Sequence, residues 1–156
     1  MRPVPITRVL PRGHWTAEPA DRVVLDYDGR HRRRIVLTGT SGAQYLLDLA
    51  EATHLRDGDG LQTADGVVAV VAKPEPLIEV RAASPEALIR LAWHIGNRHL
   101  AAAIEADRIL IRRDHVIAHM LEHQGATVCA VEEAFDPEGG AYQDHGHDHG
   151  DHHHDQ

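Results

Sequence analysis

The stretch SPEALIRLAWHIGN, residues 84–97, is where the chain changes from strand patterns to a helical one. Ser84 is a good N-cap, Pro85 suits the first helical position, and Glu86 places an acid in the first turn. The apolar residues recur at i, i+3, i+4 and i+7, and they are Leu88, Leu91, Ala92 and Ile95. This spacing predicts a helix with one face packed on a core, ending at Gly96-Asn97.

The residues around this helix predict the order β-α-β-β-α-β. LIEVRAA reads as a strand before it, and AAAIEADRILIRR supplies two more apolar runs after it. Asp114 is a good N-cap for a second helix, HVIAHMLEHQ, which Gly125 would end. Its expected inward residues are Val116, Ile117, Met120 and Leu121. ATVCAVEEAF predicts the last strand, so we expect a ferredoxin-like domain over residues 74–138.

The first half reads instead as short strands between turn signals. Asp28-Gly29 predicts a hairpin between VVLDYD and RHRRRIVLTG, and Asp57-Gly58-Asp59-Gly60 and Asp65-Gly66 mark further turns. We therefore expect a small all-β domain over residues 1–73, and an α+β chain as a whole. The basic run Arg30–Arg34 adjoins a turn and an apolar run, which favours a solvated strand face over a binding patch.

Composition and charge exclude several classes of protein. Hydrophobic residues make up 42% of 156, enough for a globular core, and no apolar run approaches the roughly 18 residues of a membrane span. The net charge of −8 argues against a nucleic-acid partner.

The N-terminus lacks a signal-peptide pattern, and the single cysteine suits a reducing cytoplasm. We expect this cysteine, Cys129, to be a buried core thiol. The sequence has no phosphate-binding loop, nucleophile elbow or H-E-x-x-H motif, so we expect no enzyme.

The C-terminal segment has the composition of a metal-binding tail. DHGHDHGDHHHDQ, residues 144–156, holds six histidines and four aspartates. The histidines are His145, His147, His149, His152, His153 and His154. Neutral imidazole is a common ligand of nickel, zinc and copper, so the pattern favours labile metal binding over a purification tag or an inert solubility tail. With almost no apolar content from residue 139 onward, we expect residues 139–156 to be disordered without metal.

Other histidines are weaker candidates from spacing alone. His99 follows the first helix and is more typical of a surface or core histidine, although a two-fold dimer would bring it beside its own copy. His115, His119 and His123 recur at i, i+4 and i+8, which is typical of a solvated polar face but also allows a pair to chelate one ion.

Four segments together resemble the urease accessory protein UreE family: SGAQYLLDLAEATHLRDGDGL, WHIGNRHLAAAIE, RRDHVIAHMLEHQGA and the histidine-rich end. The resemblance implies a cytoplasmic homodimeric nickel metallochaperone, with a β-type peptide-binding domain and a ferredoxin-like metal-binding domain. It implies that His99 of the GNRH string binds Ni(II) at the dimer interface and that His115 of the DHV string is a peripheral ligand. Some members have a second histidine where this chain has Arg113, a departure that His119 or His123 would have to make good.

The same resemblance implies the partners. The tail would collect nickel, and His99 would present it to the urease GTPase accessory protein and the apo-urease accessory complex, with Zn(II) and Cu(II) as competitors. The alternative function is a nickel or zinc store that acts through the tail alone.

Overall fold

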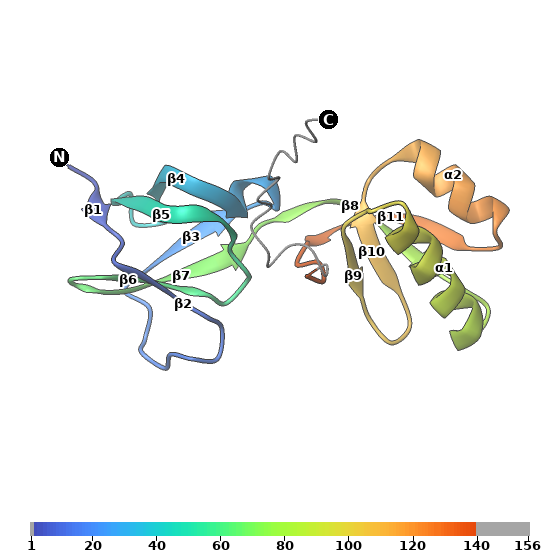
Figure 1. The fold of residues 1–156 in the computed structure, drawn as a ribbon, viewed down its shortest axis with the longest axis horizontal. Helices are drawn as coiled ribbons and strands as arrows, with labels where there is room; N and C mark the ends of the chain where they lie inside the picture. The colour runs from blue at the N-terminus through green and yellow to red at the C-terminus, as the bar shows by residue number, and fades with distance from the viewer. Residues whose placement is uncertain (1, 140–156) are drawn as a thin grey trace, which may run out of the picture.

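The computed structural model describes residues 2–139 and shows a mixed α+β chain of two lobes joined by one long strand (Figure 1). The N-terminal lobe comprises β1 (Val4–Pro5), β2 (Arg8–Leu10), β3 (Asp21–Leu25), the 3-10 turn η1 (Asp28–Arg30), β4 (His31–Thr38), β5 (Gln44–His54), β6 (Gly60–Thr63) and β7 (Gly66–Ala72). The C-terminal lobe comprises β8 (Pro74–Arg81), α1 (Pro85–Asn97), β9 (Ala102–Ile104), β10 (Ile109–Arg112), α2 (His115–His123) and β11 (Thr127–Ala134). No helix within this described part is long and apolar enough to cross a membrane.

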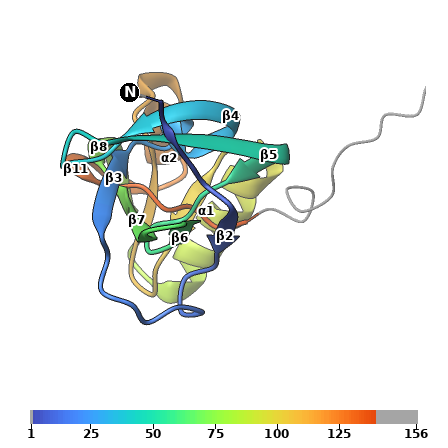
Figure 2. The same cartoon turned by 90° about the vertical axis from the view of Figure 1, so that its left-hand side faces the viewer.

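The N-terminal lobe packs two sheets on each other, with strand orders β1-β5-β4 and β2-β6-β7-β3 (Figure 2). Alternate residues of both sheets face inward and form one apolar cluster, as the period of two along a strand requires. The fully or almost fully buried members of this cluster include Val23, Leu37, Leu47, Leu55, Leu61, Val68 and Val70.

The hairpin predicted at Asp28-Gly29 is wrong. Strand β3 pairs in parallel with β7, whereas β4 pairs antiparallel with β5, so the two predicted partners lie in different sheets. The Asp26 carboxylate accepts the N–H of Gly29 at 2.7 Å, and the N–H of Arg30 donates to the Asp26 carbonyl at 3.0 Å. These bonds tighten the segment into η1, which carries the chain from one sheet to the other instead of turning it back.

Only part of the basic run is a solvated face. Arg32, Arg33 and Arg34 are exposed on β4, as expected, but Arg30 is 0% exposed. Its guanidinium donates to the backbone carbonyls of Leu25 and Leu55, which satisfy it inside the protein. Arg30 ends η1 and also donates to the Phe135 carbonyl of the C-terminal lobe, so its side chain is enclosed where the two lobes meet.

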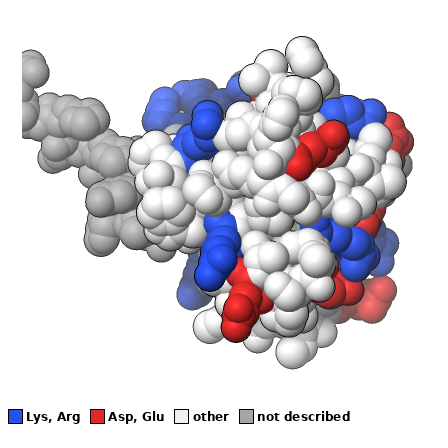
Figure 3. All heavy atoms as spheres, turned by 90° about the vertical axis from the view of Figure 1, so that its right-hand side faces the viewer, with Lys and Arg blue, Asp and Glu red and all other residues white. Residues whose placement is uncertain are grey.

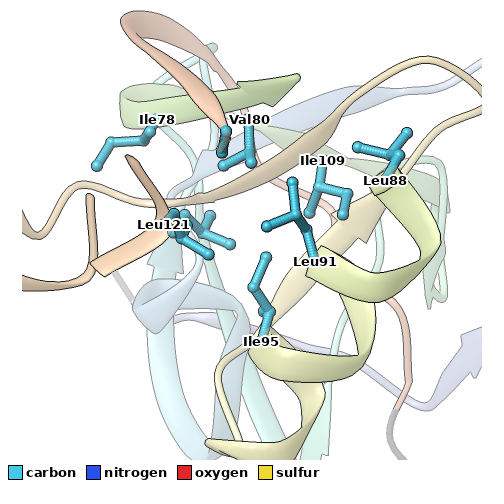
Figure 4. Packing of buried hydrophobic residues seen from close by; sticks show 9 residues of the cluster. Ile78, Val80, Leu88, Leu91, Ile95, Ile109 and Leu121 are labelled. Carbon is cyan, nitrogen blue, oxygen red and sulfur yellow. The ribbon is translucent and has the colours of Figure 1, made fainter. Parts of the chain in front are cut away.

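In the C-terminal lobe, both helices cover one face of an antiparallel sheet with strand order β11-β8-β10-β9 (Figure 1). The predicted start of α1 is confirmed, because the N–H of Ala87 donates to Ser84 Oγ at 3.1 Å. Leu88, Leu91 and Ile95 are buried against Ile109 and the other sheet residues of one cluster (Figure 4).

Helix α2 begins as expected, since the Asp114 carboxylate accepts the N–H groups of Val116 and Ile117. Val116 itself was expected to face inward, but it is 62% exposed. The inward face centres on Ile117 and Leu121, and one residue along a helix rotates a side chain by about 100°. Val116 therefore points away from the sheet.

Cys129 was expected to be buried and is exposed. It lies opposite Glu79 in the β11–β8 register, while its neighbour Val128 packs against the cluster beneath the helices. Because successive side chains of a strand point to opposite faces, Cys129 lies on the face that the helices leave open.

A buried carboxylate ties the two sheets of the N-terminal lobe together. Asp21 begins β3, and its carboxylate accepts hydrogen bonds from Ser41 Oγ at 2.5 Å and from Tyr45 OH, on β5, at 2.7 Å. Burial alone would raise the pKa of Asp21, but the hydroxyls of Ser41 and Tyr45 and two backbone N–H groups hold it well below its usual range. The same contact and burial raise the pKa of Tyr45.

Asp21→Asn should lower the free energy of unfolding at pH 7 by about 2 kcal/mol, because hydrogen bonds to the charged carboxylate are lost. A carboxylate whose folded pKa is depressed stabilises the fold above its unfolded pKa, and this contribution disappears as the pH falls from about 4 toward 2. Urea denaturation at pH 7 and at pH 3 should therefore show a smaller pH dependence in the variant. Asp48→Asn, at a half-exposed site on β5, is the control, and an unchanged pH dependence in Asp21→Asn would contradict this account.

Candidate metal centre

His99 lies immediately beyond α1, in an unusual backbone conformation. Its φ is +58°, and it is the only non-glycine residue with positive φ between residues 2 and 139. Its N–H donates to the Gly96 carbonyl at 3.0 Å, and the N–H of Leu100 donates to the Ile95 carbonyl at 3.4 Å. These two bonds form a Schellman motif, in which the left-handed position is usually occupied by glycine.

Helix α2 ends in the same motif and supplies an internal comparison. There the N–H of Gly125 donates to Glu122 and that of Ala126 donates to Leu121, each at 3.0 Å, and Gly125 has φ +89°. Helix α1 ends at Asn97, as the Gly96-Asn97 signal predicted; Arg98 is the C-cap, and the left-handed residue that follows it is His99. A histidine therefore holds a position that normally favours glycine, and a side chain retained there at a steric cost is a candidate for function.

An exposed apolar stripe on α1 leads toward His99. Ile89 is 68% exposed and Trp93 is 65% exposed, although both are large apolar side chains. Gly96 continues this line one turn later, and a Cβ added to it would meet no other part of residues 2–139 within 4 Å. Nothing within the described lobe explains the glycine or the exposure of the two large side chains.

His115 is the first residue of α2 and is exposed. Arg113 donates to the backbone carbonyls of Val131 at 2.9 Å and Leu77 at 3.4 Å, and its guanidinium, which stays protonated, offers no lone pair to a metal. A surface hollow of about 340 Å³ separates the end of α1 from the start of α2. Its lining starts at the residue after His99 and includes the residue before His115: Leu100, Ala101, Ile111, Arg112, Arg113, Asp114 and Ile117.

The structure brings two pairs of histidine rings together, one that the sequence spacing allowed and one that it did not indicate. On α2, Nε2 of His119 lies 3.1 Å from Nε2 of His123. In the N-terminal lobe, His31 and His54 face each other across β4 and β5, with their Nδ1 atoms 3.3 Å apart. The i, i+4 spacing signalled the first pair, whereas the strand register that creates the second is not readable from spacing.

The surroundings of His54 oppose a cation. Burial, followed by the charge of Arg30, lowers the pKa of His54 to about 4, so its ring is neutral at pH 7. Its Nε2 is buried without a hydrogen-bond partner among residues 2–139. Arg56 adds a further positive charge, so this pair is a poor place for a dication.

The six tail histidines lie outside the described residues, but the position from which the tail starts is visible. The N–H of Glu138 donates to the Ala102 carbonyl at 2.8 Å, and Ala102 is three residues after His99.

Within residues 2–139, no group of three or more His, Cys, Asp or Glu side chains forms a ready metal site. On the face in Figure 3, acidic and basic side chains are interspersed among uncharged ones.

Comparison with known proteins identifies relatives of both lobes. A family model described as the UreE urease accessory protein N-terminal domain matches residues 6–73, and the corresponding C-terminal domain model matches residues 75–156. The chain is 56% identical over 150 residues to the urease accessory protein UreE of Bradyrhizobium sp. (strain BTAi1 / ATCC BAA-1182), covering 96% of this chain and 73% of the relative. It is 55% identical over 134 residues to that of Chelativorans sp. (strain BNC1), covering 85% of each.

Replacing His99 with glycine should stabilise the fold in metal-free buffer. Glycine adopts positive φ without the steric cost of a Cβ, and its greater freedom in the unfolded chain offsets only part of this gain, so we expect an increase of about 0.5–1 kcal/mol in the free energy of unfolding. Urea denaturation at fixed protomer concentration measures it. The matched variant Gly125→Ala should lose about 1 kcal/mol. A His99→Gly protein less stable than its parent would show that this conformation carries no strain.

Proposed function

Because this chain belongs to the UreE family of urease accessory proteins, we propose that it is a metallochaperone that delivers Ni(II) for assembly of the urease active site. The observation that carries the proposal is His99, an exposed imidazole in a left-handed position at the end of an exposed apolar helix face. Neutral imidazole is a suitable ligand for Ni(II), and a side chain kept at a strained position implies a role outside the stability of the fold.

We propose that this site is completed by a second copy of the chain. A two-fold contact through Ile89 and Trp93 would bury both side chains, and the absence of a side chain at Gly96 would let two helices approach closely. A glycine within a helix costs about 1 kcal/mol relative to alanine, and a close approach of this kind would account for it. The His99 imidazoles of both protomers would then meet at the axis and provide two ligands.

A site with two imidazole ligands suits transfer. Ni(II) retains open or water-filled positions there, so a receiving protein can add a ligand before the donor histidines leave. Mutual replacement of ligands keeps the ion bound throughout the exchange. Zn(II) and Cu(II) bind imidazole as well and would compete for the site.

The tail is proposed to gather nickel for His99, with His115 as a peripheral ligand. Ala102 lies within about 11 Å of His99, because consecutive Cα atoms are about 3.8 Å apart. Glu138 is hydrogen-bonded to Ala102, and His145 follows seven residues later, a reach of about 25 Å when extended. The histidines of the tail, His145, His147, His149, His152, His153 and His154, would therefore be within reach of His99 in the same protomer.

The proposed organisation follows from the same family. Residues 1–73 would form a β-type peptide-binding domain that contacts the urease GTPase accessory protein and the apo-urease accessory complex in the cytoplasm. Residues 74–138 would form a ferredoxin-like metal-binding domain, supported by the β-α-β-β-α-β order and the strand order β11-β8-β10-β9. Residues 139–156 would be the metal-collecting tail. Storage or buffering of nickel or zinc is the second candidate, favoured by the number of tail histidines.

His99→Ala separates delivery from storage. The full-length variant should lose about one Ni(II) per dimer in calorimetry while retaining the tail sites, because the axial pair is the only site built from this position. Urease activation, measured in a reconstituted assay with apo-urease and its accessory proteins, should fall at least about ten-fold, since a single lost ligand pair removes the transfer site. His14→Ala, at an exposed histidine of the N-terminal lobe, is the control. Full activation by His99→Ala, with nickel binding unchanged by this variant and lost only on replacing the tail histidines, would favour storage.

Gly96→Arg tests the dimer face independently of metal. A large charged side chain between the two copies of α1 should shift the protein from dimer to monomer at micromolar concentration, as measured by light scattering. Helix content by circular dichroism should persist, because a Cβ at this position meets nothing among residues 2–139. Glu122→Arg on the exposed side of α2 should leave the mass unchanged. A Gly96→Arg dimer would place the contact elsewhere.

A further inference from the structure

The pair His119 and His123 is built like the two-imidazole half of a metal site. The two Nε2 atoms are 3.1 Å apart, the ring centroids are 4.6 Å apart, and the rings are nearly perpendicular at 89°. Both side chains are exposed. We propose that this pair is a second divalent-metal site, separate from His99, which takes Ni(II), Cu(II) or Zn(II).

The distance between the nitrogens matches the bite of a chelated ion. Metal–imidazole bonds are ~2.0–2.1 Å long, so two nitrogens 3.1 Å apart subtend about 95–100° at a shared ion. That angle lies between the cis angle of square-planar or octahedral sites and the tetrahedral angle, which covers the preferred geometries of all three ions. Chelation would require the rings to rotate until both lone pairs point at one ion, and exposed side chains change rotamer on the picosecond to nanosecond timescale.

The electrostatic setting of α2 also favours a cation. His123 is the last residue of the helix and His119 lies one turn earlier, where the helix dipole places about half a negative charge. The helix carries no Lys or Arg from His115 to His123. This contrasts with His31 and His54, whose ring nitrogens are similarly close but lie near the positive charges of Arg30 and Arg56.

The scaffold that holds the pair is firm at both ends. The Asp114 carboxylate caps the first turn, and the Schellman motif at Gly125 closes the last turn. Leu121, between the two histidines in sequence, is fully buried and fixes the rotation of the helix on the sheet. The two imidazoles are therefore pre-positioned, which reduces the ordering entropy that opposes binding by a flexible chain. Water can complete the coordination sphere from the exposed side.

This site depends only on the geometry of α2 and would stand if nickel delivery through His99 failed. The competing explanation of the 3.1 Å separation is a hydrogen bond in which one Nε2–H donates to the other Nε2. A hydrogen-bonded pair needs no metal and would leave α2 unaffected by added ions. The two explanations therefore differ in a local response to metal.

The test is residue-specific NMR of the isotopically labelled full-length chain, titrated with Cu(II) below one equivalent. Paramagnetic broadening of the amide signals of residues 119–124 is expected in the parent protein. His119→Gln and His123→Gln should each weaken this response about ten-fold or more, because the second imidazole is supplied at a high effective concentration. Zn(II) titrations monitored by the ring resonances of the remaining histidines give the affinities. Glutamine is a good helix former, so the helix should persist in both variants.

His94→Gln, on α1, is the matched control and should leave the α2 response unchanged. If the α2 signals do not respond to Cu(II), the pair is a hydrogen bond only and the proposal is overturned. If they respond equally in His119→Gln and His123→Gln, the ion is held by the tail or by His115, which also overturns it. Neither result bears on urease activation by His99, which is measured separately.

Discussion

The buried guanidinium of Arg30 holds the two lobes of this protein together. It is fully buried, and it donates to the carbonyls of Leu25 and Leu55 in the N-terminal lobe and of Phe135, the residue after β11. Its charge faces Asp136, whose Oδ1 lies 3.6 Å from Nη1. A buried cation without such partners would cost several kcal/mol. Separating the lobes would remove the Phe135 carbonyl and the Asp136 carboxylate from the Arg30 guanidinium, which opposes their separation.

Neighbouring contacts reinforce this junction. Asp136 is also paired with Arg56 at 3.2 Å and with Arg12 at 3.3 Å, so three arginines converge on one carboxylate. Phe135 is fully buried, and its ring lies 5.3 Å from that of Tyr27. The chain that follows Asp136 therefore starts from a defined place. The bond from Glu138 to Ala102 then directs it to the strand that follows His99, which is why the tail and the proposed axial site belong to one arrangement.

Helix α1 concentrates features that are unfavourable for an isolated chain. Trp93 and Ile89 are exposed, Gly96 weakens the helix although a Cβ there would clash with nothing in the described part of the chain, and His99 takes a backbone position better suited to glycine. Residues that are unfavourable for the stability of their own helix are expected mainly at functional sites, where selection for activity retains them. A two-fold metal-bridged contact would account for all of them together, whereas a tail-based store would account for none.

The sequence by itself determined the features that depend on a few neighbouring residues. Sequence patterns were enough to identify the Ser84 and Asp114 caps, the apolar stripe of α1, the strand-rich first half and the family resemblance, because capping and periodicity act within one or two turns.

Tertiary structure decided the features that depend on distant partners. The bond from Arg30 to Phe135 spans 105 residues, and β3 pairs with β7 and not with β4, so neither the burial of Arg30 nor the failure of the Asp28-Gly29 hairpin has a local signal. Likewise, histidine spacing suggested that His119 and His123 share a face, but only the packing of Leu121 fixes the rotation that exposes their rings, 3.1 Å apart at Nε2. The sequence specifies which side chains are available, and long-range packing specifies which of them meet.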